Sequence, residues 1–113
     1  MPAAGQNSSN ILDQLEKTIR ERREIADPST SYVAQLFNKG DKKIAEKVGE
    51  EAVEVIIAAL TEEKADLENE AADLLFHLMV LLSAKNSSLD AVCQILQGRL
   101  GLSGIEEKNS RTN

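Results

Sequence analysis

Apolar residues recur at intervals of three and four along most of the chain, which is the spacing of an amphipathic helix. In the first part of the sequence this spacing is set by Leu12, Leu15 and Ile19. Asn10 precedes this stretch, and asparagine is among the preferred residues at a helix N-cap. The pattern therefore predicts a first helix that starts after Asn10, and residues 1–9 are expected to form a flexible tail.

The segment 27–31, with sequence DPSTS, interrupts the helical pattern. Pro28 disfavours helical geometry at the residue before it, so the first helix should end there. The sequence predicts a short second helix over 32–38. Gly40 follows this helix and suits its C-terminal cap, because glycine readily adopts the conformations that end a helix.

Two long helices are predicted in the middle of the chain. Asp41 can start the first of them, and Thr61 is expected to close it and to cap the second, which runs over 62–84. The stretches 53–60 and 71–84 are almost continuously aliphatic. A helix that is apolar most of the way round must be covered on several sides, and a chain of this size has few other helices to cover it. A homodimer with a shared helical core is therefore expected.

A last helix is predicted after Ser88, a good N-cap residue. Glycines at 98, 101 and 104 are expected to end regular structure. The fold class is thus predicted as all-α: a bundle of four to five helices, completed by homodimerisation. It forms one domain over 10–113, with a C-terminal tail from about residue 98.

Composition limits the classes of function. The chain has 113 residues and a formal net charge of −6, which argues against a general nucleic-acid binder. The run Leu74–Leu82 is too short to span a bilayer, and residues 1–10 lack the apolar segment of a signal peptide. The single cysteine, Cys93, cannot form an internal disulfide, which fits the cytoplasm, and it is expected to be a small buried apolar residue.

Five acidic residues interrupt the two apolar central helices. They form a first cluster on one helix and a second on the next: Glu50, Glu51 and Glu54, then Glu70 and Asp73. Burying an ionised carboxylate in a helix interface has a desolvation penalty on the order of several kcal/mol, unless the carboxylate is paired or binds a cation.

Helical spacing brings these clusters together. Positions three and four apart lie on one face, so Glu51 neighbours Glu54, and Glu70 neighbours Asp73. Glu51 and Glu70 stand equally far along the sequence from the turn expected near Thr61. If the helices pack antiparallel, the clusters face each other and offer four to five oxygen donors. Such donors suit one or two Mg²⁺ ions, and carboxylate-bound magnesium usually indicates phosphate chemistry. The alternative is that the acidic residues form an ordinary solvated helix face.

Other candidate residues are weaker signals. Lys39, Lys43 and Lys47 lie near Gly40 and can receive a polyphosphate, although lysines at such positions are more often plain surface charges. His77 lies one turn beyond Asp73. It is a possible accessory residue that touches phosphate or a metal-bound water, but a hydrogen-bonded core histidine is the favoured interpretation.

Several segments resemble one family. The acidic pattern is similar to that of the MazG-like superfamily of all-α nucleotide pyrophosphatases. The closer resemblance is to the phosphoribosyl-ATP pyrophosphohydrolases of histidine biosynthesis. It is carried by 31–37 (SYVAQLF), 47–55 (KVGEEAVEV), 70–78 (EAADLLFHL) and 103–108 (SGIEEK), and it extends over about 12–111.

The resemblance implies hydrolysis of phosphoribosyl-ATP to phosphoribosyl-AMP and pyrophosphate with Mg²⁺, the second step of L-histidine biosynthesis, by a cytoplasmic all-α dimer. The working hypothesis assigns magnesium to Glu51, Glu54, Glu70 and Asp73. Glu50 and Glu51 are the candidate catalytic residues, with Glu50 completing a second metal site or orienting the attacking water. The three lysines are assigned to the departing pyrophosphate.

Two rival functions stay open at this point. One is a house-cleaning pyrophosphatase for noncanonical nucleoside triphosphates, which would use the same carboxylates with a different base pocket. The other is a helical dimerisation or adaptor module without enzymatic activity, in which the acidic faces are simply solvated.

Overall fold

The computed structural model describes the backbone of residues 4–100 and the side chains of residues 11–100. This part of the chain is made of helices joined by short connections, and it contains no strand. The helices are α1 (Ala4–Ile25), α2 (Tyr32–Lys39), α3 (Asp41–Thr61), α4 (Lys64–Ala84) and α5 (Leu89–Arg99). The predicted all-α class is confirmed.

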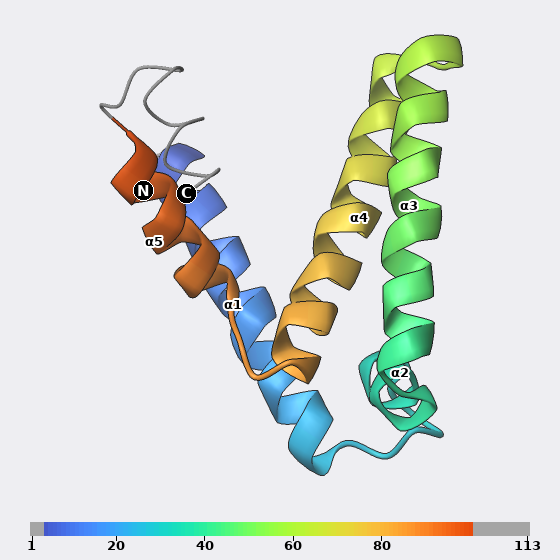
Figure 1. Ribbon diagram of the computed structural model, residues 1–113, viewed down its shortest axis with the longest axis vertical. Helices are drawn as coiled ribbons and strands as arrows, with labels where there is room; N and C mark the ends of the chain where they lie inside the picture. The colour runs from blue at the N-terminus through green and yellow to red at the C-terminus, as the bar shows by residue number, and fades with distance from the viewer. Residues whose placement is uncertain (1–3, 101–113) are drawn as a thin grey trace, which may run out of the picture.

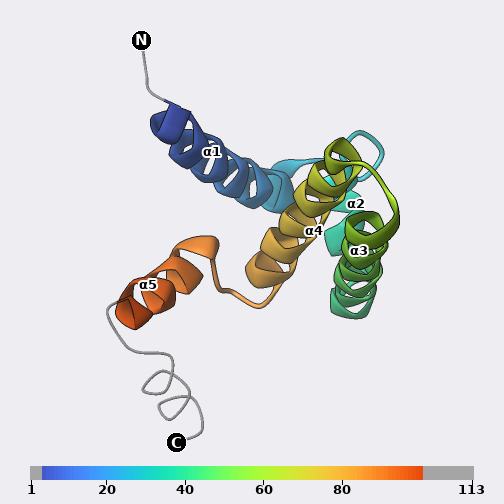
Figure 2. The ribbon, with the colours of Figure 1, turned by 90° about the horizontal axis from the view of Figure 1, so that it is seen from above.

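Helices α3 and α4 form an antiparallel hairpin, and α1 leads away from the base of this hairpin (Figures 1 and 2). The short helix α2 lies at the base, where α1 ends and α3 begins (Figure 1). Helix α5 starts close to α1. The backbone N–H of Leu89, its first residue, donates a 2.6 Å hydrogen bond to the carboxylate of Glu16 on α1. The end of the hairpin near Thr61 has no other described helix beside it (Figure 1).

The buried core lies at the base of the hairpin. One apolar cluster joins α1, α2, α3 and α4, and its buried members are Ile19, Val33, Leu36, Ile44, Met79 and Val80. The Arg23 guanidinium adds a contact between α1 and α2, because it lies 5.2 Å from the centre of the Phe37 ring. The base is therefore the well-packed region of the chain, and it fixes the direction in which the hairpin extends.

Local sequence signals explain most helix ends. The Ser31 hydroxyl accepts a hydrogen bond from the Ala34 backbone N–H at 3.2 Å, and Ser88 makes the equivalent bond to Ala91 at 3.1 Å. Gly40 ends α2 with φ +99°, a backbone conformation that residues with a Cβ rarely adopt. The predicted caps at Gly40 and Ser88 are confirmed.

Three predicted boundaries are wrong or shifted. Helix α1 begins at Ala4, so the predicted start after Asn10 is wrong and most of the expected tail is helical. Thr61 ends α3 as predicted, but its hydroxyl donates to the Ile57 carbonyl, so α4 is capped instead at Glu63. Helix α5 runs through Gly98 to Arg99, because a glycine costs a helix only about 1 kcal/mol. The other predicted terminators, Gly101 and Gly104, and the segment 103–108 lie outside the described residues.

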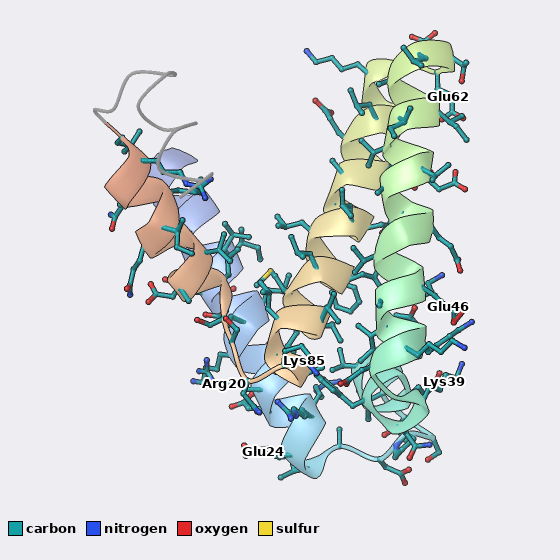
Figure 3. The ribbon with its side chains drawn as sticks, in the orientation of Figure 1. Arg20, Glu24, Lys39, Glu46, Glu62 and Lys85 are labelled. Carbon is teal, nitrogen blue, oxygen red and sulfur yellow. The ribbon has the colours of Figure 1, made fainter. Side chains whose placement is uncertain are left out.

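The hairpin carries an exposed apolar stripe on α3. Its members are spaced at three and four residues and keep about half or more of their surface exposed: Val53 (54%), Ile56 (58%), Ile57 (44%) and Leu60 (79%). Glu62 marks the free end of the hairpin, and Lys39 and Lys85 mark its base (Figure 3). The apolar positions that the sequence places on α3 are therefore only partly covered within one chain.

Cys93 corrects another expectation. The thiol lies on α5, a helix with no buried residue, and it is exposed rather than buried. The apolar spacing of α5 is real, but its apolar residues Ile95 and Leu96 are also more than half exposed. Within residues 4–100, no helix is long and apolar enough to cross a membrane.

Candidate carboxylate metal centre

Three of the predicted acidic residues converge between α3 and α4. Glu51 comes from α3, and Glu70 and Asp73 come from α4. Each offers a carboxylate oxygen, and these oxygens lie within 4.8 Å of one another. The antiparallel turn between Thr61 and Lys64 produces this arrangement, because it places residues equally far from the turn side by side. Oxygens this close can share one hard divalent cation.

The electrostatics at Glu70 are those of a crowded acidic site. Desolvation raises the pKa of the Glu70 carboxyl, and the negative charges of Glu54, Glu51, Asp73 and Glu62 raise it further. Glu54 is thus close enough for its charge to act on Glu70, although it is not one of the three residues whose oxygens converge. Repulsion of this kind is relieved when a cation binds among the carboxylates.

Glu50 and Lys47 lie beside this group. The Lys47 ammonium donates a 3.4 Å hydrogen bond to the Glu50 carboxylate and lies 3.9 Å from a Glu51 oxygen. Desolvation would lower the pKa of Lys47, but the hydrogen bond and charge of Glu50, followed by Tyr32 and Glu51, outweigh it and raise the pKa. The structure therefore turns Glu50 toward Lys47 and leaves it outside the converging group, and its catalytic role stays a prediction.

The predicted phosphate-binding lysines are not equivalent. Lys47 touches the acidic group, whereas Lys39 lies at the base of the hairpin, at the opposite end from Glu62 (Figure 3). Lys43 is half-buried on α3. Among the described side chains, neither Lys39 nor Lys43 forms an ion pair with the acidic residues. Lys47 is the member of this set that the fold brings to the site.

His77 is a buried residue of α4 and both of its ring nitrogens have partners. Its Nδ1 lies 2.8 Å from the Asp73 carbonyl oxygen, and its Nε2 lies 2.9 Å from the Tyr32 hydroxyl. This confirms the interpretation of His77 as a hydrogen-bonded core histidine. Tyr32, the first residue of α2, was not among the predicted site residues. The signal that pointed to it was the 31–37 segment, which resembles the family but carries no obvious chemistry.

The fold and the site together define an all-α protein with a group of converging carboxylates between two antiparallel helices. The family model for phosphoribosyl-ATP pyrophosphohydrolase matches residues 12–99. The chain is 58% identical to a phosphoribosyl-ATP pyrophosphatase of Novosphingobium aromaticivorans, over 91% of this chain and 95% of the relative. Similar relatives occur in Erythrobacter litoralis (57% identity, 90% of this chain and 97% of the relative) and Zymomonas mobilis (52%, 92% and 96%).

The chain belongs to the phosphoribosyl-ATP pyrophosphohydrolase family. It is therefore an enzyme of the hydrolase class, and the interpretation of the chain as a non-enzymatic helical module is set aside. The resemblance predicted from the sequence segments is confirmed.

Proposed function

We propose that this protein hydrolyses phosphoribosyl-ATP to phosphoribosyl-AMP and pyrophosphate, the second step of L-histidine biosynthesis, with Mg²⁺ as cofactor. The observation that carries the proposal is the convergence of Glu51, Glu70 and Asp73 in a chain that belongs to this family. The substrate is a polyphosphate anion, which a site of bare carboxylates would repel. A divalent cation held by those carboxylates reverses the local potential and makes the two compatible.

The residues present fit magnesium rather than a softer metal. All three converging donors are carboxylate oxygens, and hard cations prefer oxygen ligands. Desolvation raises the pKa of Glu70, the negative charges of Glu54, Glu51 and Asp73 raise it further, and a bound cation would offset these charges. Glu54 is proposed as an additional ligand, because its charge already acts on Glu70. Bound magnesium supplies positive charge at the phosphate oxygens that become more negative as the anhydride bond breaks.

The chain's own residues supply orientation and further charge. Lys47 lies at the rim of the carboxylate group, where its ammonium can receive the departing pyrophosphate. Glu50 fixes the Lys47 ammonium through its hydrogen bond, and it can also orient the attacking water as predicted. Lys39 and Lys43 are proposed to act on the more distant phosphates. Catalysis of this kind rests on positioning and charge neutralisation.

Pyrophosphate release from phosphoribosyl-ATP tests this function directly. Rapid release with magnesium that stops with a chelator is expected. The alternative, a house-cleaning pyrophosphatase, predicts faster turnover of noncanonical nucleoside triphosphates than of phosphoribosyl-ATP. Steady-state rates on both substrate classes therefore decide between them, and absence of release from folded, magnesium-loaded protein would contradict the proposal.

We also propose that the protein functions as a homodimer in the cytoplasm. The support for self-association is the α3 stripe of Val53, Ile56, Ile57 and Leu60, which borders the acidic site and is left exposed in one chain. The stripes of two copies can pack against each other, as a two-fold interface between identical chains requires. Light scattering coupled to gel filtration gives the mass of the assembly.

A further inference from the structure

The hydrogen bonds of His77 fix the role of the Tyr32 hydroxyl. A backbone carbonyl can only accept, so the His77 Nδ1 that lies 2.8 Å from the Asp73 carbonyl must carry a hydrogen. A neutral imidazole has one ring hydrogen, so Nε2 is then an acceptor. The Tyr32 hydroxyl, 2.9 Å from Nε2, must donate to it. Its single hydrogen is thereby used, and the phenolic oxygen can only accept further hydrogen bonds.

Tyr32 is held in place on one side and open on the other. Its ring stacks on Phe76 at a centroid distance of 6.1 Å and meets the edge of His77 at 5.8 Å. Even so, 47% of the residue is exposed. An aromatic side chain fixed by two rings and a hydrogen bond, yet half open to solvent, presents a rigid apolar surface.

Tyr32 also lies next to the acidic site. His77, its hydrogen-bond partner, is one helical turn from Asp73 on α4 and contacts the Asp73 backbone. On the other side, Lys47 of α3 is near enough to Tyr32 that an ionised Tyr32 oxygen would raise the pKa of Lys47. The contacts thus run from Asp73 through His77 to Tyr32, and they join α4 to α2 at one edge of the site.

We infer that Tyr32 contacts the nucleoside part of the substrate and that His77 is the positioning residue that holds it. Phosphate oxygens carry lone pairs and almost no hydrogen at neutral pH, so an oxygen that can only accept does not bind them. Ribose hydroxyls and an exocyclic amino group of the base do donate, and the exposed ring offers a surface on which a nucleoside can pack. This inference rests on the proposed function, because it takes a nucleotide as the ligand of the site.

The test separates nucleoside binding from phosphate binding. In steady-state kinetics with phosphoribosyl-ATP and magnesium, Tyr32→Phe should raise KM about two- to tenfold, the range expected for one hydrogen bond, and should leave kcat within about twofold. Tyr32→Leu, which also removes the ring, should raise KM further. Inhibition by inorganic tripolyphosphate should be unchanged in both variants. Gln35→Ala, an exposed substitution on the same helix, should behave as wild type.

A double-mutant cycle tests the positioning role of His77. If His77 acts by holding Tyr32, the two substitutions should not have multiplicative effects. The double variant Tyr32→Phe/His77→Gln should then have the KM of the single variant that raises KM more. Independent, multiplicative effects would overturn this role. Circular dichroism confirms that each variant is folded. If tripolyphosphate inhibition weakens in parallel with KM, or if KM does not change, Tyr32 is not a nucleoside contact.

Direct binding measurements test the role of Tyr32 independently of the proposed catalytic activity. Calorimetry measures the affinity of magnesium-loaded protein for phosphoribosyl-AMP and for tripolyphosphate without any turnover. If wild type releases no pyrophosphate, the proposed function fails. A selective loss of phosphoribosyl-AMP affinity in Tyr32→Phe would then still support the role of Tyr32. Equal losses for both ligands, or no phosphoribosyl-AMP binding by wild type, would overturn it.

Discussion

Glu51 on α3 and Asp73 on α4 bring carboxylate oxygens within 4.8 Å of each other across the hairpin. Two ionised carboxylates this close repel each other, and a cation that lies between them relieves this repulsion. The same hairpin leaves its free end without a neighbouring helix (Figure 1). The acidic group lies about halfway along the hairpin, between its free end and its packed base, and the pairing of α3 with α4 holds it together.

Replacing Glu51 by glutamine should reduce kcat by more than about 100-fold, which is the upper range for losing a residue that only supports a metal ligand. The substitution keeps the size of the side chain and removes the charge that a cation needs. Glu46→Gln is the matched control, because Glu46 is an exposed glutamate of the same helix. Pyrophosphate release and circular dichroism measure both variants. Near-normal activity of Glu51→Gln in folded protein would contradict the assignment of Glu51 to the metal.

Glu70→Gln should stabilise the protein in chelator and abolish its stabilisation by magnesium. The pKa of Glu70 is raised in the folded state, so its contribution to stability is present below its ordinary value of 4.5 and is lost as the pH rises through the raised pKa. At neutral pH the ionised carboxylate therefore destabilises the metal-free fold.

Thermal melts of Glu70→Gln and wild type, with magnesium and with chelator, measure both effects. In chelator the two proteins should melt alike near pH 4, and the variant should melt at increasingly higher temperature as the pH approaches 7. With magnesium, the melting temperature of wild type should rise, because the ion binds the folded state, and that of the variant should not. A magnesium shift of equal size in both proteins would place the ion elsewhere.

The helical pattern was sufficient to predict the all-α class and the approach of Glu51, from the first acidic cluster, to Glu70 and Asp73 of the second. Helical periodicity places Glu70 beside Asp73, and equal separation from the turn places Glu51 opposite them. Both relations depend only on backbone geometry, which the sequence specifies well. The cap at Gly40 was predictable for the same reason, since its backbone conformation strongly favours glycine.

The positions of long side chains were not predictable in this way. Glu50 is as close in sequence to Glu54 as Lys47 is to Glu51, yet its carboxylate turns to Lys47 and leaves the group. The partnership of Tyr32 with His77 joins residues 45 positions apart, and only the packing of α2 against α4 reveals it. The burial of Cys93 was predicted wrongly because apolar spacing shows that a face exists but not that another element covers it.

Ile56→Glu should dissociate the proposed dimer. Ile56 lies in the middle of the exposed α3 stripe, and the substitution removes apolar burial and places a charge at the interface. Together these should weaken dimerisation at least about 100-fold. Ile25→Glu is the control, because Ile25 is an exposed isoleucine on α1, away from the stripe. Sedimentation velocity over a range of concentrations gives the dissociation constants. Equal association of wild type and Ile56→Glu would exclude the stripe as the interface.

Replacing Gly40 and replacing Gly49 by alanine should change the free energy of unfolding in opposite directions. A Cβ at either Gly40 or Gly49 would meet no atom within 4 Å, so steric clashes do not distinguish them. Gly40 has φ +99° and ψ 171°, a region that only glycine adopts readily, and Gly40→Ala should lower the free energy of unfolding by about 1–3 kcal/mol. Gly49 lies inside α3, where alanine is the better helix former, and Gly49→Ala should raise it by about 0.5–1 kcal/mol.

Urea unfolding at one fixed protein concentration measures both glycine variants, since the stability of a dimer depends on concentration. Because neither substitution removes a side-chain contact, the opposite signs isolate the backbone conformation as the cause. A loss of stability in Gly49→Ala would instead indicate that another chain approaches α3 closely at this residue, next to the proposed interface. A Gly40→Ala variant as stable as wild type would show that the junction between α2 and α3 can relax, and the base of the hairpin would then be less rigid than its buried core indicates.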